Sequence, residues 1–349
     1  MLFIRESRLS DEKSGVVDTD LQRPLVAGKT TWSKLPLVRF FEPSQNALIA
    51  WNGQEEILYL TTDVSASRAS KVLEVLPLPS QPKVSKGDFK TLDNAVAILN
   101  SKIASYPGDR GDTHVRGLIR DDDEAKVQPP AAVIVTHNQI GSHEVSVVKV
   151  LDPARFVSWT EANLKKLGSA SPNVPAWMKE KIEHYTKIGF HWFAFDVVEL
   201  QTQLKSIEPL RYRFATSQLF YPLQITRVEG ASYVNLMVMS SRPISKIDDI
   251  HGAQISYPRG TYYLSNLDLD KIDQEMKAVL YADRHHMPVI GVWQLNNRIG
   301  LGYQNDLFGH FSASDDAVKH QMLAKPNAVN NHLPGKRWHN LTPATYSGG

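Results

Sequence analysis

The sequence contains no cysteine among its 349 residues. This absence excludes disulfide bonds, zinc sites with thiolate ligands, iron–sulfur clusters and cysteine nucleophiles. A chain without cysteine is also compatible with oxidising and reducing surroundings alike, because it has no thiol to oxidise and no disulfide to reduce. Cysteine usage therefore places the protein neither inside nor outside the cell.

The sequence also lacks an excess of charge and long apolar runs. Its 39 basic residues nearly balance its 37 acidic ones, for a net charge of +2. This balance gives no electrostatic footprint for nucleic acid, and no basic run suits an anionic membrane surface. The N-terminus lacks the apolar run of a signal peptide, and other apolar runs are shorter than the ~18 residues of a membrane span. We expect a soluble chain with no transmembrane segment and no nucleic-acid partner.

The strongest structural signal present is Asn52-Gly53 between two apolar runs, residues 47–51 and 57–60. Asn-Gly favours a type I′ turn, in which both central residues have positive φ, and such a turn joins two antiparallel strands. The sequence therefore predicts a hairpin here. Neighbouring strands are predicted at 36–41 and 71–76.

Helices are predicted where apolar residues recur every three or four positions. The best example is residues 88–103, with Asp88 as N-cap. Its predicted buried face is Phe89, Leu92, Val96, Leu99 and Ile103. Further helices are predicted at 152–168, 175–188 and 268–281, and further strands at 131–137, 144–150, 190–199, 209–216, 220–228, 232–240 and 288–294.

Strands that come in runs, instead of alternating with helices, predict an α+β fold with a mostly antiparallel sheet. Residues 36–301 are expected to form the core. Two similar halves within it, 36–150 and 151–301, each contain strands, a hairpin and a helix. Polar residues predict an irregular N-terminal arm over 1–35 and an irregular C-terminal tail over 302–349.

Candidate chemistry is sparse, since the sequence has no nucleophile elbow, zinc-protease helix or Rossmann fingerprint. Asp283, His285 and His286 follow a predicted helix, and such groups can bind zinc or copper. Neighbouring side chains on a strand face opposite ways, however, so the two histidines would not share a metal from a strand.

The run Arg211-Tyr212-Arg213-Phe214 allows two interpretations. Its arginines and aromatic rings could bind an anionic or planar ligand. Alternatively, the aromatic residues pack in a sheet while the arginines point outward.

Four segments together resemble one uncharacterised prokaryotic family, DUF2330, over about residues 36–245. They are residues 45–56, residues 71–79, the helical hairpin with Tyr185 and Gly189-Phe190, and Glu208 to Phe214 followed by Tyr221-Pro222-Leu223. The resemblance implies an exported or envelope-anchored protein and supplies no agreed activity. Without a visible signal peptide, a cytoplasmic location stays open.

These observations favour a non-enzymatic binding or assembly module of the cell envelope or exterior. Its expected partners are copies of itself, a homo-oligomer formed through the terminal arms, or other envelope proteins. Within the tail, Trp338 and Tyr346 are expected to anchor such a contact. The alternative is a metal-dependent hydrolase that uses Asp283, His285 and His286 with zinc or copper.

Overall fold

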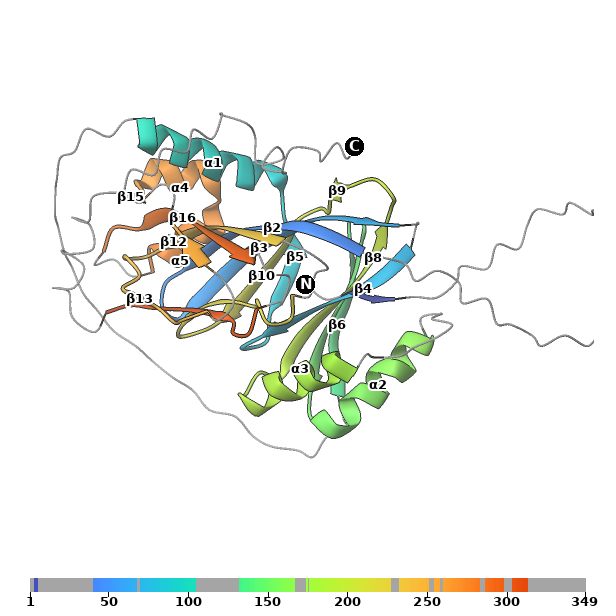
Figure 1. Ribbon diagram of the computed structural model, residues 1–349. Helices are drawn as coiled ribbons and strands as arrows, with labels where there is room; N and C mark the ends of the chain where they lie inside the picture. The colour runs from blue at the N-terminus through green and yellow to red at the C-terminus, as the bar shows by residue number, and fades with distance from the viewer. Residues whose placement is uncertain are drawn as a thin grey trace, which may run out of the picture.

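The computed structural model shows four stacked layers, two of helices and two of β-sheet (Figure 1). Two helices cover the outer face of a five-stranded sheet, sheet A. The inner face of sheet A packs against a nine-stranded sheet, sheet B, whose outer face carries the other three helices of the described chain. The structure describes residues 3–5, 40–67, 70–104, 132–166, 174, 176–226, 232–250, 254–257, 260–282, 286–297 and 303–312.

Sheet A is antiparallel throughout and runs in the order β1-β4-β8-β7-β6. Its strands are β1 (Phe3–Arg5), β4 (Ser70–Leu78), β8 (Trp192–Leu200), β7 (His143–Val150) and β6 (Ala132–Ile140). Alternation sends Val75 and Phe193 to the outer face, where α2 (Pro153–Lys166) and α3 (Ala176–Lys187) cover them. Leu76 and Ala194 face sheet B instead.

Sheet B contains the predicted hairpin at its centre. Its order is β14-β16-β12-β2-β3-β10-β5, with β15 paired to β16 and β9 to β3. The bounds are β14 (Gln254–Ser256), β16 (Val289–Asn297), β12 (Ser232–Ser240), β2 (Phe40–Trp51), β3 (Glu55–Ala66), β10 (Leu210–Ala215), β5 (Lys83–Lys86), β15 (Thr261–Tyr263) and β9 (Lys205–Ser206). Pairings are antiparallel except that β12 runs parallel to β2, so the described strands confirm the α+β, mostly antiparallel class.

The turn of the hairpin lies one residue later than predicted. Trp51 pairs with Glu56, and the backbone N–H of Asn52 donates to the carbonyl of Glu55, so Gly53 and Gln54 occupy the turn. Gly53 has the expected positive φ, 94°. The Oδ1 atom of Asn52 accepts from the N–H groups of Gln54 and Glu55, which explains the shift, because the side chain replaces a backbone turn bond.

Helix α1 (Phe89–Ala104) confirms the predicted helix, and Asp88 Oδ1 accepts from the N–H of Lys90 at its start. The buried face is rotated from the predicted one. Leu92 and Leu99 are buried as expected, together with Thr91, Ala95 and Ile98. The prediction was wrong for Phe89, Val96 and Ile103, which are only partly buried at the margin of the contact with sheet B.

The single helix predicted at 268–281 is two short helices, α4 (Asn266–Ile272) and α5 (Gln274–Leu280). Asp273 ends the first and begins the second. Its backbone is extended, with φ of −166°, and its side chain accepts from the N–H of Met276. The carboxylate at this position is therefore a cap, and it interrupts the helix that its apolar spacing predicts.

A third, small sheet covers another part of the inner face of sheet B, with the order β11-β17-β13. Its strands are β11 (Leu219–Tyr221), β17 (Leu307–His310) and β13 (Lys246–Ile247). Strands β17 and β1 lie in segments predicted to be irregular, so that prediction was wrong there. The reason for β17 is clear, since Leu307 is fully buried in the core between the sheets. Residues 6–39 and 313–349, with Trp338 and Tyr346, lie outside the described residues.

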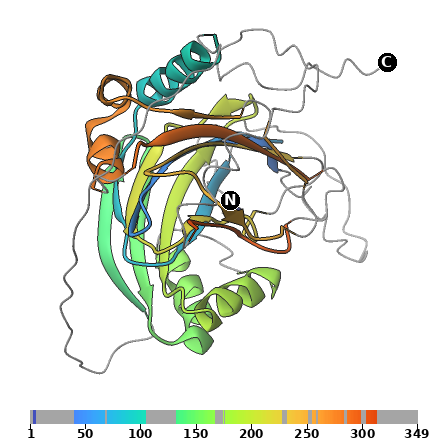
Figure 2. The same ribbon diagram turned by 90° about the vertical axis from the view of Figure 1, so that its left-hand side faces the viewer.

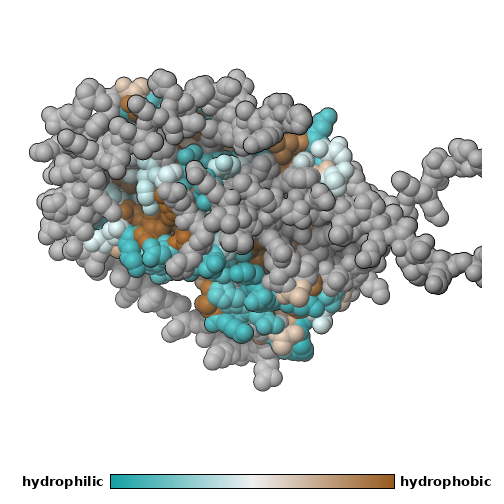
Figure 3. Space-filling model, in the orientation of Figure 1, coloured by the Kyte–Doolittle hydropathy of each residue, from teal (hydrophilic) through white to brown (hydrophobic). Residues whose placement is uncertain are grey.

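The two helical layers lie on opposite sides of the sheets, as the turned view in Figure 2 shows. The lower layer, α2 with α3, presents mostly hydrophilic residues in Figure 3. Among the helices that the structure describes, none is both long and apolar enough to cross a membrane. Strands from before and after residue 150 lie in both large sheets, and the similarity of two halves stays a prediction.

Candidate functional site

Strand β10 contains residues 210–214 of the motif Glu208 to Phe214 that the sequence singles out. It pairs with β3 on one side and with β5 on the other. The period of two in a strand sends Tyr212 and Phe214 into the core between the sheets. Arg211 and Arg213 therefore point to the opposite face, toward α5.

A small cavity lies beside Tyr212, between the two large sheets. Its volume is about 10 Å³, which is close to the smallest space that holds one water molecule. Its lining is Leu60, Thr61, Thr62, Glu74, His143, Ile207, Glu208, Leu210 and Tyr212. The cavity is too small for a substrate, but it marks where ionisable side chains from three strands meet.

His143 is the central residue of this cluster. It begins β7 directly after the Gly141-Ser142 turn, and its side chain is 3% exposed. Nδ1 lies 2.5 Å from Oδ2 of Asp196, and Nε2 lies 2.9 Å from the carbonyl oxygen of Glu208. Both partners are acceptors, so the ring satisfies both only when each nitrogen carries a proton. The geometry therefore fits an imidazolium paired with a carboxylate.

The pKa shift of His143 favours this protonation state, whereas the net rise in the pKa of Asp196 opposes it. Burial lowers the pKa of His143, but the hydrogen bond and negative charge of Asp196, with a contribution from Glu208, outweigh burial and raise the pKa above its usual value. Burial raises the pKa of Asp196, and the bond from His143 opposes that rise. Each partner stabilises the charge of the other, since either one alone would be a buried, uncompensated charge.

A second carboxylate and a phenol complete the cluster. Glu74 on β4 pairs directly with Asp196 on β8, and both side chains lie on the inner face of sheet A. Tyr212 approaches from sheet B. Burial raises the pKa of Tyr212 well above its usual value, and the charges of Asp196 and Glu74 raise it further.

These residue types could perform acid–base chemistry in an open site. Here Glu74, His143, Asp196 and Tyr212 are each at most 2% exposed. A general acid or base has to come within hydrogen-bond reach of its substrate, which burial prevents. The cluster therefore acts in this structure as a polar link between the two sheets.

Glu208 contacts the Gly141-Ser142 turn at the end of the cavity. Its Oε2 atom accepts from the N–H of Ser142, and its Oε1 lies 2.9 Å from Lys86 Nζ. A Cβ atom added at Gly141 would lie 2.3 Å from Oε2, and Gly141 has φ of 60°. The positive φ at this turn therefore favours glycine, and a larger residue would also displace the Glu208 carboxylate from its contacts with Ser142 and Lys86.

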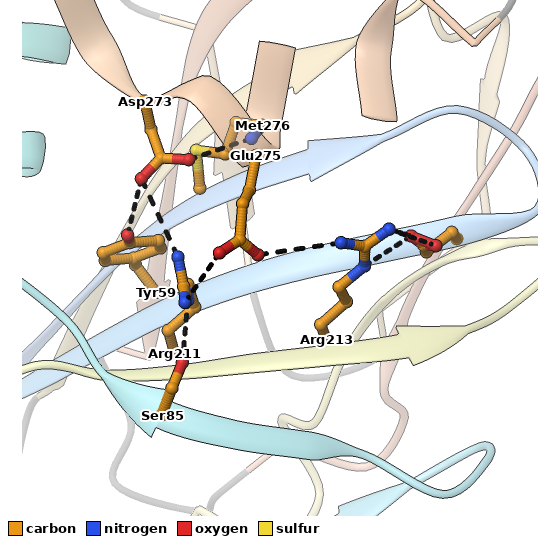
Figure 4. Close-up of polar contacts among 8 residues, drawn as sticks. Tyr59, Ser85, Arg211, Arg213, Asp273, Glu275 and Met276 are labelled. Carbon is orange, nitrogen blue, oxygen red and sulfur yellow. Dashed lines mark hydrogen bonds and ion pairs between the residues drawn. The ribbon is translucent and has the colours of Figure 1, made fainter. Parts of the chain in front are cut away.

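Arg211 is bound by carboxylates of α5 (Figure 4). Its Nη2 lies 3.0 Å from Oε1 of Glu275, and its Nε donates to Ser85 over 2.8 Å. Next to it, the hydroxyl of Tyr59 donates to Asp273 over 2.9 Å. These contacts attach the start of α5 to the outer face of sheet B.

Arg213 is matched in the same way. Its Nε and Nη2 atoms donate to the two oxygens of Glu55 over 2.6 and 3.0 Å, and its Nη1 lies 3.6 Å from Glu275. Both arginines thus have partners within the chain. This arrangement favours sheet packing with outward arginines over an anion-binding site.

The predicted metal ligands are only partly described. Asp283 and His285 lie outside the described residues, whereas His286 lies just before β16 and is partly buried. Among the described residues, no group of three or more histidines and carboxylates is placed to hold a metal ion. The zinc or copper site at Asp283, His285 and His286 stays a prediction.

The buried cluster itself was missed in the sequence. His143, Val145 and Val147 alternate with less buried residues, a pattern that places His143 on an apolar strand face. Nothing local indicates that Glu74 and Asp196 lie opposite each other, because that pairing joins strands far apart in the chain.

One protein-family model matches more than half of the chain. Among curated proteins no match was found. The solved crystal structure of baculovirus P35 is similar over 79% of this chain and 98% of that one, with 9% identity and a TM-score of 0.34. The family model described as "Uncharacterized protein conserved in bacteria (DUF2330)" matches residues 38–287. The chain therefore belongs to the DUF2330 family.

Proposed function

We propose that the protein is a non-enzymatic binding or assembly module of the bacterial cell envelope or exterior, and that it self-associates. The observation that carries the proposal is the burial of the His143, Asp196, Glu74 and Tyr212 cluster. The residues best suited to catalysis are used to join two sheets. The cavity beside them has room for about one water molecule.

The location rests on the DUF2330 resemblance, which implies exported or envelope-anchored proteins. Fractionation of the native host, with the protein detected in the envelope or the medium, tests this part. Recovery in the cytoplasm alone would overturn it.

Self-association through the terminal arms is part of the same proposal. Sedimentation of the full chain should show an oligomer, and truncation after residue 323 should reduce its mass while the core stays folded. A full-length monomer at high concentration would contradict self-association. An unchanged oligomer after truncation would contradict the role of the tail.

The alternative enzyme is separated from this proposal by elemental analysis of the purified chain. A metal-dependent hydrolase would contain stoichiometric zinc or copper, and replacing His285 and His286 by alanine would release it. The proposed module would contain neither metal in stoichiometric amount.

A further inference from the structure

Strand β6 is an edge strand of sheet A (Figure 2), and β1 is at the other edge among the residues that the structure describes. Strand β6 pairs with β7 along one side. From residue 133 to residue 139 every side chain is exposed, so neither face of the strand is covered. Three consecutive apolar side chains, Val133, Ile134 and Val135, are 38%, 44% and 39% exposed.

An edge strand offers unpaired N–H and C=O groups to any other extended chain. Proteins normally protect such an edge with charged residues, with proline or with a covering segment. The strand from Ala132 to Ile140 contains no lysine, arginine, aspartate, glutamate or proline. Its one irregularity is a bulge between Ile134 and Thr136, which leaves the run from Thr136 to Ile140 in regular pairing with β7.

We propose that β6 pairs antiparallel with β6 of a second copy of this chain, which joins the two copies of sheet A into one continuous sheet. This inference rests on the proposed self-association but places the interface at β6 instead of at the terminal arms. A strand related to itself by a two-fold axis runs antiparallel to its mate, as an isologous interface requires. Because β6 contains no lysine, arginine, aspartate or glutamate, self-pairing brings no such charges together.

The exposed side chains favour the same partner. Val133 and Ile134 point to opposite faces of the strand. Ile134 lies opposite Val148 and Thr136 opposite Val147, so Val135 is the extra residue of the bulge. A second β6 presents the same apolar residues, so pairing buries apolar surface on both faces at once. Backbone hydrogen bonds supply the alignment, and these side chains supply the hydrophobic contribution.

The first experiment places a charge on the edge. Ile134→Lys in the full chain should convert a dimer into a monomer, halving the mass measured by sedimentation. Ile188→Lys is a matched control, since Ile188 is the same residue type, is 47% exposed and lies directly after α3. The control should keep the mass unchanged, and thermal melts should show both variants folded.

The second experiment uses the absence of cysteine, because one introduced cysteine is then the only thiol in the chain. Single cysteines are placed in turn at residues 133–139 of the full chain and oxidised. In antiparallel self-pairing only one residue faces its own symmetry mate, at a Cα separation that a disulfide can bridge, about 4.4–6.8 Å. Covalent dimer should therefore peak at one position and fall away on both sides.

The outcomes separate this inference from the proposed function. If the full-length oligomer keeps its mass in Ile134→Lys, or if no cysteine position along β6 gives a maximum of covalent dimer, β6 pairing is overturned. The terminal arms then remain as the interface. A full-length monomer overturns both. A monomer whose β6 becomes protected from hydrogen exchange only when another protein is added identifies a different partner for this edge and also overturns self-pairing.

Discussion

The hydroxyl of Tyr185 donates a hydrogen bond of 2.9 Å to Oδ1 of Asp306, which joins α3 to the segment before β17. The same oxygen accepts from the backbone N–H of Gln224 over 2.8 Å. Both side chains of the pair are almost fully buried. This contact links the outer helical layer of sheet A to the small third sheet.

The Tyr185–Asp306 contact predicts a pH effect on stability. Burial raises the pKa of Asp306 to about 6, although hydrogen bonds from Gln224 and Tyr185 oppose the rise. The folded state therefore holds this proton more tightly than the unfolded state, so the contribution of Asp306 to stability falls as pH rises from about 4 to 6. Over that pH range the free energy of unfolding of Asp306→Asn should fall by about 3 kcal/mol less than that of the wild type, as measured by urea denaturation. Identical pH profiles for the two proteins would contradict the raised pKa.

The His143–Asp196 pair predicts a strong energetic coupling. His143→Leu should destabilise the protein by about 3–5 kcal/mol, because it leaves Asp196 as a buried charge without its partner. The double variant His143→Leu with Asp196→Leu should recover much of that loss. Chemical denaturation of the wild type, the two single variants and the double variant gives the coupling energy. Additive effects of the two substitutions would show that the pair is not coupled.

The same pair has a defined pH dependence. The pKa of His143 is raised in the folded state. Its stabilising contribution is therefore complete below the unfolded pKa and is lost as pH rises through the folded value. The difference in the free energy of unfolding between the wild type and His143→Leu should therefore shrink as the pH rises through the folded-state pKa of His143.

The hairpin turn predicts a specific intolerance at Gly53. This residue has φ of 94°, and a Cβ atom added to it would lie 3.2 Å from the ring of Phe311. Gly53→Val should cost more than ~1 kcal/mol, since a β-branched residue is strained at positive φ and meets the ring as well. Gly189→Val is the control, because its φ is 93° and nothing lies within 4 Å of its added Cβ. Equal losses in thermal stability would assign the whole effect to backbone strain.

Helix α1 predicts a graded response along its length. Leu99 is 3% exposed against the outer face of sheet B, so Leu99→Ala should cost about 2–5 kcal/mol. Val96→Ala should cost clearly less, because Val96 lies at the margin of the same contact. Denaturant midpoints compare the two. A larger loss at Val96 would contradict the observed orientation of the helix.

Local sequence patterns predicted the helices and strands better than they predicted which strands pair with each other. Asn52-Gly53 predicted the β2–β3 hairpin because two adjacent strands form one local unit, and apolar spacing predicted α1 for the same reason. The turn was displaced by one residue because the Asn52 side chain bonds the backbone. Asp273 divided a helix because a carboxylate that caps one helix cannot be told from a first-turn carboxylate by spacing alone.

The polar cluster could not be predicted from the sequence for a different reason. Glu74, His143 and Asp196 come from β4, β7 and β8, and Tyr212 comes from the other sheet. Each looks like an ordinary polar residue in its own segment. Only the pairing of β4 with β8 and of β7 with β8 brings the three side chains of sheet A together.

The parallel pairing of β2 with β12 has a consequence for how the chain reaches its fold. Asn46 and Asn235, which share a buried hydrogen bond across this pairing, are 189 residues apart. During synthesis the β2–β3 hairpin leaves the ribosome with one edge unsatisfied until β12 and then β16 follow. Such long-range closure makes folding slow and exposes apolar strands in the meantime. We therefore expect the nascent protein to depend on chaperones until about residue 300 has emerged.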